Sequence, residues 1–555
     1  MTALSIPAPL LLKEARALAP IWLAAGATMW AGAAMGALHV GLFAFAFGAA
    51  ALGASSIGHE YAHRTLTTLL AQPLARSRLL AAKVLVLAAL LVLLTVVAWL
   101  MLLQADGMER LLGRGTDGVS WQRAILLLTP ALGLCVAPWL TIACRGAMAG
   151  IVFTLAIPAL CWLAVQIARA ALSGFDVEPL AYGPGLVLMM AAVAAASVVG
   201  AVRGRARFLG LEALDVSADI APVLRRRWRG IGVSGIGGQA DADRRFAGIR
   251  GPLVALVRKE IRLQSLAFVV AGLYALCWIA MSLGRLDQII AGQSFEALAG
   301  IYGGFLALLV GASASAEERA LGTREWQALQ PYAFWKQWAI KVVTISVLAL
   351  VLGIGLAAVL EWIFPLVRDS GTSGPWSPPI FRGPIFRRLL GFLLPSALSG
   401  GALAIVVVVA ISVFVSSLCT GGLRALIVAL PFTAGLAWMY ARLIGSIFSL
   451  DTLVLTRLYG AAASPTPVWL WMRRLPTAST ADARWSILAF EWTGAVVLAG
   501  FLALMLRLAY RNHFSAEHGG SSAVRQMAGV AGYVIIGGAI AFGGPRVLEW
   551  FLFTH

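Results

Sequence analysis

The chain contains the letters HEYAH beginning at His59, a match to the HExxH pattern of zinc metallopeptidases. On a helix this spacing places His59 and His63 on one face, one turn apart, with Glu60 beside them as the candidate general base. A related segment occurs farther along the chain, where Glu317 and Leu321 stand in place of the histidines. No third ligand follows at a spacing known for zinc sites. We therefore expect no metal and no catalytic residue here, and we keep an intramembrane zinc metallopeptidase as an alternative function.

The related segments form an internal repeat. Residues 58–83 and 316–341 align at a single offset of 258 residues. Each combines an acidic residue near the end of an apolar run, a threonine able to cap, an amphipathic stretch and then a proline. This pattern is typical of a short helix lying on the membrane surface. The identical pairs are Glu60 and Glu318, Thr65 and Thr323, Gln72 and Gln330, Pro73 and Pro331, and Lys83 and Lys341.

A second pair of segments supports the duplication. LLLKEAR around Lys13 and Glu14 matches LVRKEIR around Lys259 and Glu260, at an offset of 246 residues. We expect both Lys-Glu pairs to lie on amphipathic interfacial helices that precede the first span of each copy.

The composition places these segments in a membrane protein. Of 555 residues, 60% are hydrophobic and 12% are charged, and the mean hydropathy is +0.87. A soluble domain has about half apolar and about a quarter charged residues, so lipid must solvate most of this chain. Uncharged runs of about 20 residues are typical of spanning helices, which satisfy their backbone hydrogen bonds internally. The predicted fold class is all-α, a polytopic membrane protein.

Twelve spans are predicted, six in each of two copies, and 527–544 is a candidate thirteenth. Because six spans return the chain to the starting side, the copies should be parallel repeats related by a pseudo-twofold axis. The predicted spans are 18–35, 38–58, 84–104, 122–143, 149–168 and 181–201, then 265–283, 295–316, 342–362, 396–418, 424–445 and 486–508. The predicted domains are a first half, 1–201, a basic cytoplasmic linker, 202–252, a second half, 253–512, and a C-terminal tail, 513–555.

Basic residues are concentrated on one side of these spans. The segments 59–83, 202–262, 317–341 and 507–526 hold most of them, so this side and the N-terminus are predicted to be cytoplasmic. The net charge of +18 suits anionic lipid headgroups. Without a fold that presents the charge to bases, we expect membrane lipid and no nucleic acid as a partner.

Each half resembles a permease of the ABC-2 type ABC exporter family. That family has an N-terminal interfacial helix, and after its second span a motif Glu-x-x-x-Gly-Thr, leucines, a proline and a lysine entering the third span. The second half matches this motif with Glu318, Gly322, Thr323, Pro331 and Lys341.

The first half matches the same motif less completely. Glu60, Thr65, Pro73 and Lys83 are in place, but Arg64 replaces the glycine. The resemblance covers both halves, from about residue 10 to about residue 510.

The resemblance implies a multi-pass permease subunit of an ATP-driven exporter in the bacterial inner or plasma membrane, not an enzyme. The segment after the second span of each half would be a coupling helix that docks on a nucleotide-binding subunit. This chain has no GxxxxGK[ST] loop, so we expect no cofactor on it, ATP on a separate ATPase partner, and two ATPase copies for two coupling helices. The implied coupling residues are Glu60, Arg64, Thr65, Pro73, Glu317, Glu318, Gly322, Thr323 and Pro331.

A simpler interpretation makes the repeated segments interfacial anchors. Arg76, Arg78 and Lys336 would then extend to lipid headgroups. In either case we expect Arg78, Lys83 and Lys341 to act as such anchors.

An ion-coupled secondary transporter is a further alternative, because six-plus-six spans with a basic central loop also occur there. Ion coupling usually needs acidic residues deep in the bilayer. The candidates Asp106, Glu361, Asp451 and Glu491 all fall near the outer ends of predicted spans.

Overall fold

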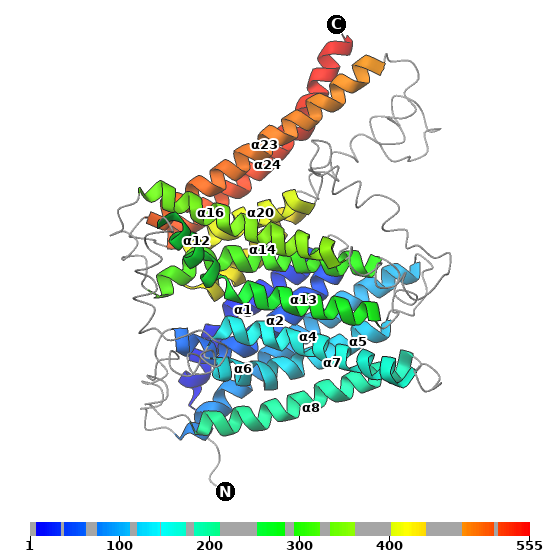
Figure 1. The fold of residues 1–555 in the computed structure, drawn as a ribbon, viewed down its shortest axis with the longest axis vertical. Helices are drawn as coiled ribbons and strands as arrows, with labels where there is room; N and C mark the ends of the chain where they lie inside the picture. The colour runs from blue at the N-terminus through cyan, green and yellow to red at the C-terminus, as the bar shows by residue number, and fades with distance from the viewer. Residues whose placement is uncertain are drawn as a thin grey trace.

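The computed structural model is helical throughout the residues it describes (Figure 1). Within these ranges the chain forms α-helices and short π-helical segments, joined by brief turns, and no strand. The all-α fold predicted from the sequence is confirmed. The described residues are 7–34, 38–62, 75–111, 119–144, 146–173, 182–210, 252–283, 293–321, 333–360, 401–439, 480–514 and 520–554.

The helices follow the order expected of two successive units. The first unit contains α1 (Ala8–Ala34), α2 (Leu38–Ala62), α4 (Arg76–Leu111), α5 (Val119–Ala131), the π-helical η1 (Leu132–Val136), α6 (Ala137–Cys144), α7 (Ala147–Ser173) and α8 (Tyr182–Leu209). The second contains α12 (Pro252–Leu263), α13 (Ser265–Leu283), α14 (Gln293–Leu321), α16 (Phe334–Leu350), η3 (Val351–Gly355), α20 (Gly401–Leu418), an unlabelled helix over Gly422–Met439, α23 (Thr480–Phe514) and α24 (Gly520–Thr554).

Many of these helices are suited to cross a membrane. Among the described residues ten are long and apolar enough, or eleven if the bent pair Leu256–Leu263 and Ser265–Ile279 is one span. Two shorter apolar helices cover Ala147–Cys161 and Ala402–Leu418. The described part of each predicted span lies on a helix, and the candidate span at 527–544 lies on α24. The polytopic architecture is confirmed.

The helices α2 and α14 are the most buried of these spans. In each, 78% of the most apolar stretch is buried, against 22% in the span that begins with α16. Small residues allow this close packing. A Cβ atom added to Gly53 of α2 would lie 1.9 Å from the carbonyl oxygen of Gly133, and one added to the equivalent Gly311 of α14 would lie 2.5 Å from Cβ of Ser412. In lipid, the burial of apolar side chains contributes little to helix association. Close approach at small residues instead stabilises the helix pair through van der Waals attraction.

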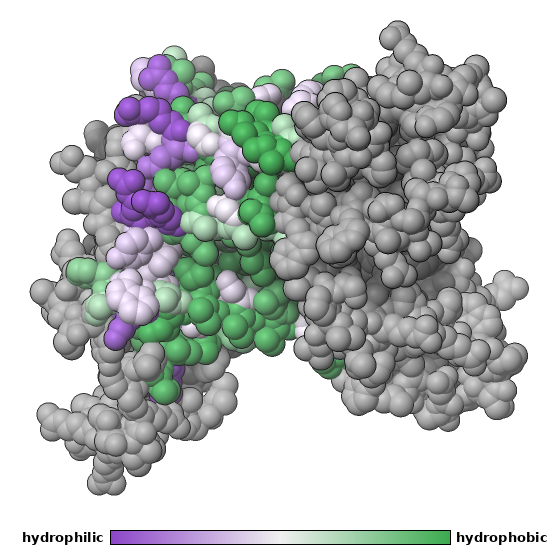
Figure 2. Space-filling model, turned by 90° about the horizontal axis from the view of Figure 1, so that it is seen from above, coloured by the Kyte–Doolittle hydropathy of each residue, from purple (hydrophilic) through white to green (hydrophobic). Residues whose placement is uncertain are grey.

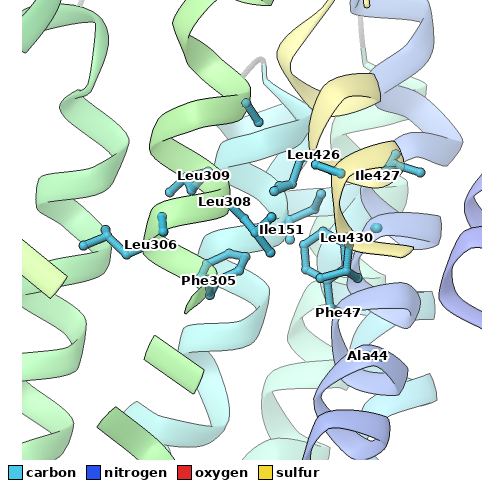
Figure 3. Packing of buried hydrophobic residues seen from close by; sticks show 14 of the residues in the cluster. Ala44, Phe47, Ile151, Phe305, Leu306, Leu308, Leu309, Leu426, Ile427 and Leu430 are labelled. Carbon is cyan, nitrogen blue, oxygen red and sulfur yellow. The ribbon is translucent and has the colours of Figure 1, made fainter. Parts of the chain in front are cut away.

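The two units meet along α2 and α14. Phe47 of α2 and Phe305 of α14 are related by the repeat offset of 258 residues, and their ring centroids are 5.9 Å apart (Figure 3). Two equivalent residues can touch only beside the axis that relates the copies. Around it α13 packs on α7, while Trp30 of α1 lies 5.3 Å from Trp438 of the Gly422–Met439 helix. These contacts support the expected parallel duplication.

The outer helices expose apolar side chains. On α4, Val92 and Trp99 are 62% and 47% exposed, and Val187 of α8 is 64% exposed. On the face shown in Figure 2, hydrophilic residues gather on the left, and apolar residues cover most of the coloured surface beside them. Such a surface would drive association in water, whereas lipid tails solvate it without cost.

Candidate functional site

Two groups of charged residues, each with two buried carboxylates and one buried lysine, lie at the same end of the helix bundle. The first, at the meeting point of α1, α2 and α4, contains Lys13, Glu14, Glu60 and Lys83, and we call it the first charge cluster. The Lys83 ammonium donates to both carboxylate oxygens of Glu14, at 2.8 and 2.9 Å, and to the Ser56 carbonyl at 3.0 Å. Oε1 of Glu60 lies 3.4 Å from Lys83 Nζ and 3.5 Å from Lys13 Nζ. One lysine therefore connects three helices.

The second charge cluster lies where α12, α14 and α16 meet, and it contains Lys259, Glu260, Glu318 and Lys341. Lys341 donates to Oε2 of Glu318 and, at 3.0 Å, to the Ala314 carbonyl. Lys259 donates to Oε1 of Glu318 at 2.7 Å. Oε1 of Glu260 lies farther away, 3.7 Å from Lys341 Nζ and 3.9 Å from Lys259 Nζ.

The clusters are equivalent residue by residue. The offsets of 246 and 258 residues found in the sequence convert every member of the first cluster into a member of the second, and they also convert Ser56, whose carbonyl accepts from the lysine, into Ala314. The central side chains are withdrawn from solvent: Glu14, Glu60 and Glu260 are 1% exposed, Glu318 is 0%, and Lys83 and Lys341 are 3%.

Balanced charge explains how these groups tolerate burial. Each cluster has as many lysines as carboxylates, and each central lysine donates to a carboxylate and to a backbone carbonyl. Removing one partner of a buried ion pair strands the other charge and costs about 3–5 kcal/mol. The clusters therefore hold their helices together only while both signs are present.

The lysines are not the lipid anchors that the sequence suggested. The prediction for Lys83 and Lys341 was wrong, because both ammonium groups point inward to buried carboxylates instead of outward to headgroups. Arg78 and Lys336 are exposed, as an anchor must be. Arg76 donates to the Leu209 carbonyl at 2.9 Å and so joins the start of α4 to the end of α8.

The Lys-Glu segments expected on interfacial helices differ between the halves. Lys13 and Glu14 lie on α1, which continues without a break into its span. Lys259 and Glu260 lie on the separate α12, which meets α13 at an angle of 55°. In both cases the glutamate faces the protein and not the membrane surface.

Only some of the implied coupling residues lie in the described part of the chain. Glu60, Glu317 and Glu318 stand in the last turns of α2 and α14. Glu317 is half-buried, and a Cβ atom added to Gly422 would lie 3.2 Å from its Cγ, so this carboxylate lies beside the Gly422–Met439 helix. The residues outside the described ranges are Arg64, Thr65, Pro73, Gly322, Thr323 and Pro331, together with His63 of the zinc alternative.

The zinc hypothesis meets a competing cation. Ligand atoms of Glu14, His59 and Glu60 all lie within 4.8 Å of one another, with Nε2 of His59 3.1 Å from Glu60 Oε1. The Lys83 ammonium already binds these carboxylates, and Nδ1 of His59 lies 2.8 Å from the Ser55 carbonyl oxygen. A metal ion would have to displace a buried lysine, which disfavours this site for zinc.

Sequence reasoning missed a polar contact that occurs in the second half. Ser315 Oγ of α14 lies 2.6 Å from Nδ1 of His513 on α23, and both residues are buried. Ile57, the equivalent of Ser315, instead belongs to an apolar cluster with Ile142 and Phe208. The sequence did contain one signal for this contact, because the repeat aligns the polar Ser315 with the apolar Ile57.

The sequence comparisons agree with this geometry. Residues 2–159 match the family model described as ABC-2 family transporter protein. The match contains the whole first charge cluster and supports the resemblance to the ABC-2 permease family over this part of the first half. Neither a curated protein nor a solved structure matches the chain. The chain is thus a multi-pass membrane protein whose residues 2–159 are similar to ABC-2 family transporters, and this similarity supports a transporter permease role.

Truncating a central lysine should destabilise the protein strongly. In Lys83→Met or Lys341→Met two buried carboxylates lose their common partner, so we expect a loss of about 3–5 kcal/mol in unfolding free energy. Arg78→Met, at an exposed site on the same end of α4, should change it by less than about 1 kcal/mol. Unfolding of the purified full-length protein checks this, and equal effects at Lys83 and Arg78 would contradict a buried ion-pair role.

Proposed function

We propose that this chain is the membrane permease subunit of an ATP-driven ABC exporter, with ATP hydrolysis on a separate nucleotide-binding partner. The observation that carries the proposal is the position of the two charge clusters. Each cluster lies beside the two ends of one repeated segment. Glu60 or Glu318 lies in the helix before that segment, and Lys83 or Lys341 lies in the helix after it. The ABC-2 match over residues 2–159 supports the same role.

The charge clusters connect each proposed coupling segment rigidly to the helix bundle, so that a movement of the segment would reach the bundle. Residues 63–74 are flanked by the end of α2 and the start of α4, and Lys83 joins both of these to α1. A partner that moved the segment would therefore move three helices as one body, because separating them would break a buried ion pair. In the second half Lys341 supplies the same connection.

The duplication extends the proposal beyond the matched residues. The second half carries an equivalent cluster, so we infer two permease halves, 1–201 and 253–512, joined by the linker 202–252 and followed by the tail 513–555. Two coupling segments at one end of the bundle would accept two ATPase copies. In this arrangement the segments rich in basic residues and the N-terminus face the cytoplasm of a bacterium, where the basic side chains contact anionic lipid.

The substrate path would follow the interface of the halves. Phe43, Phe47 and Phe305 close this interface, with centroid distances of 5.6 Å for Phe43 and 5.9 Å for Phe47 to the ring of Phe305. Aromatic side chains from both halves on a pseudo-twofold axis would separate when the halves move apart. We propose that this contact closes the path in the conformation described here.

The ATPase assignment is tested by assembly. The full chain, co-expressed with the ATPase encoded next to it, should purify as a complex with two ATPase copies per chain, as weighed by native mass spectrometry. The double variant Thr65→Arg, Thr323→Arg should lose the ATPase, because it places bulk and charge in both coupling segments. The exposed Ser77→Arg, at the start of α4, is the control. A complex that survives the double variant intact would remove the coupling assignment.

The aromatic closure is tested by leakage. In proteoliposomes, Phe47→Ala with Phe305→Ala should raise permeability to a small fluorescent anion several-fold, because both rings leave the axis together. Phe268→Ala removes a ring that is 43% exposed on α13 and should leave permeability unchanged. Equal leakage from the two variants would contradict a path at this interface.

A further inference from the structure

The central lysines of the two charge clusters differ in which carboxylate they hold more closely. Lys83 donates to both oxygens of Glu14, at 2.8 and 2.9 Å, and at the longer distance of 3.4 Å to Oε1 of Glu60. In the second half the preference is reversed: Lys341 binds Glu318, the equivalent of Glu60, while its Nζ is 3.7 Å from Glu260. Among the described residues neither oxygen of Glu260 has a hydrogen-bond partner, although this side chain is 1% exposed.

The helices that carry the first glutamate also differ. α1 runs unbroken through Leu18, which is completely buried. The residue 246 positions farther on is Gln264, at the point where α12 ends and the chain turns by 55° into α13. The glutamate held tightly by its lysine therefore lies on the continuous helix α1, and the loosely held one lies beside the break between α12 and α13.

The bend has a local cause in the sequence. The side chain of Gln264 accepts a hydrogen bond from Ser313 Oγ at 2.7 Å and donates to the Val310 carbonyl at 3.3 Å, both on α14. A leucine can make neither bond. In the first half, α1 carries Leu18 at the position of Gln264. Ser55, the first-half equivalent of Ser313, is buried, and its hydroxyl has no hydrogen-bond partner in the described part of the chain.

From these differences we propose that the central lysine of each cluster exchanges between two carboxylates as its half changes conformation. When the first helix is continuous, its glutamate reaches the lysine. When the helix breaks at the position of Leu18 or Gln264, that glutamate withdraws and the lysine binds the glutamate that precedes the repeated segment, Glu60 or Glu318. The two halves of this protein display the two positions at once.

An exchange of this kind is energetically accessible to a buried charge. The lysine never leaves the set of carboxylates that neutralises it, so the large cost of an isolated buried ion does not arise. The backbone carbonyl of Ser56 or Ala314 holds the ammonium in both positions. Two discrete pairings of similar energy are what a two-state element requires.

Only the consequence of the exchange rests on the proposed function. If an ATPase moves the coupling segments, the exchange links that movement to the bending of the first helix in each half. The exchange itself belongs to the isolated chain, so it is measured without a partner. If the ATPase did not bind, the proposed exchange of the lysine between two carboxylates would be unaffected.

Double-mutant cycles on the full-length protein test the proposal. Thermal unfolding gives the coupling of Lys83→Met with Glu14→Gln or Glu60→Gln, and of Lys341→Met with Glu260→Gln or Glu318→Gln. We expect the stronger coupling at Glu14 in the first half and at Glu318 in the second. The same order in both halves would overturn the proposal.

The bend is then removed or introduced by one substitution. Gln264→Leu should straighten α12 and α13 and transfer the stronger coupling of Lys341 from Glu318 to Glu260. Gln337→Leu, which removes another buried polar side chain from the same half, should leave the order unchanged. If Gln264→Leu does not fold, Leu18→Gln offers Ser55 a partner and should move Lys83 toward Glu60. If the order of the coupling energies stays the same in these variants, the two halves have two fixed structures and the lysine does not exchange.

Discussion

An ammonium group buried to 3% exposure requires carboxylates at hydrogen-bond distance, and this requirement fixes which helices can be neighbours at one end of the bundle. Lys83 satisfies it with Glu14 of α1 and Glu60 of α2, and Lys341 satisfies it with Glu318 of α14, while Glu260 of α12 lies 3.7 Å from its Nζ as an ion-pair partner. Because the lysine stands near the start of the helix that follows the repeated segment, this segment must begin and end at the same end of the bundle. The interaction therefore determines where both repeated segments are attached, and the proposed function depends on that attachment.

The two halves share this interaction but are built differently around it. Ser315 contacts His513 in the second half, where Ile57 packs against apolar residues in the first. Arg319 donates to the backbone of Cys419 and Asn512, and the Asn512 side chain pairs with Gln526 of α24. The end of α14 is thus bonded to Cys419, directly after α20, to α23 and, through Asn512, to α24. A chain that carries both halves can vary them independently, which a symmetric dimer of identical subunits cannot do.

Much of the fold could be predicted because lipid imposes simple rules. Apolar runs of spanning length predicted the helices, and the repeat offset predicted which charged residues are equivalent. Charge type alone misled the interpretation of Lys83 and Lys341, since a lysine at the end of a span is normally solvated by headgroups. Its burial depends on Glu14 and Glu60, which are distant in sequence and adjacent only after folding. The Gln264 bend was likewise hidden, because one polar residue at a helix junction acquires meaning only from its partner on α14.

The central claim is that the duplicated clusters attach both repeated segments to one face of the membrane, the face of the ATPase. Cysteine labelling in oriented vesicles tests it directly. The five native cysteines are replaced, single cysteines are placed at Thr65 or Thr323, and a membrane-impermeant maleimide is added from either side. Both positions should react from the cytoplasmic side alone, and bound ATPase should protect both. Labelling of the two positions from opposite sides would contradict the claim.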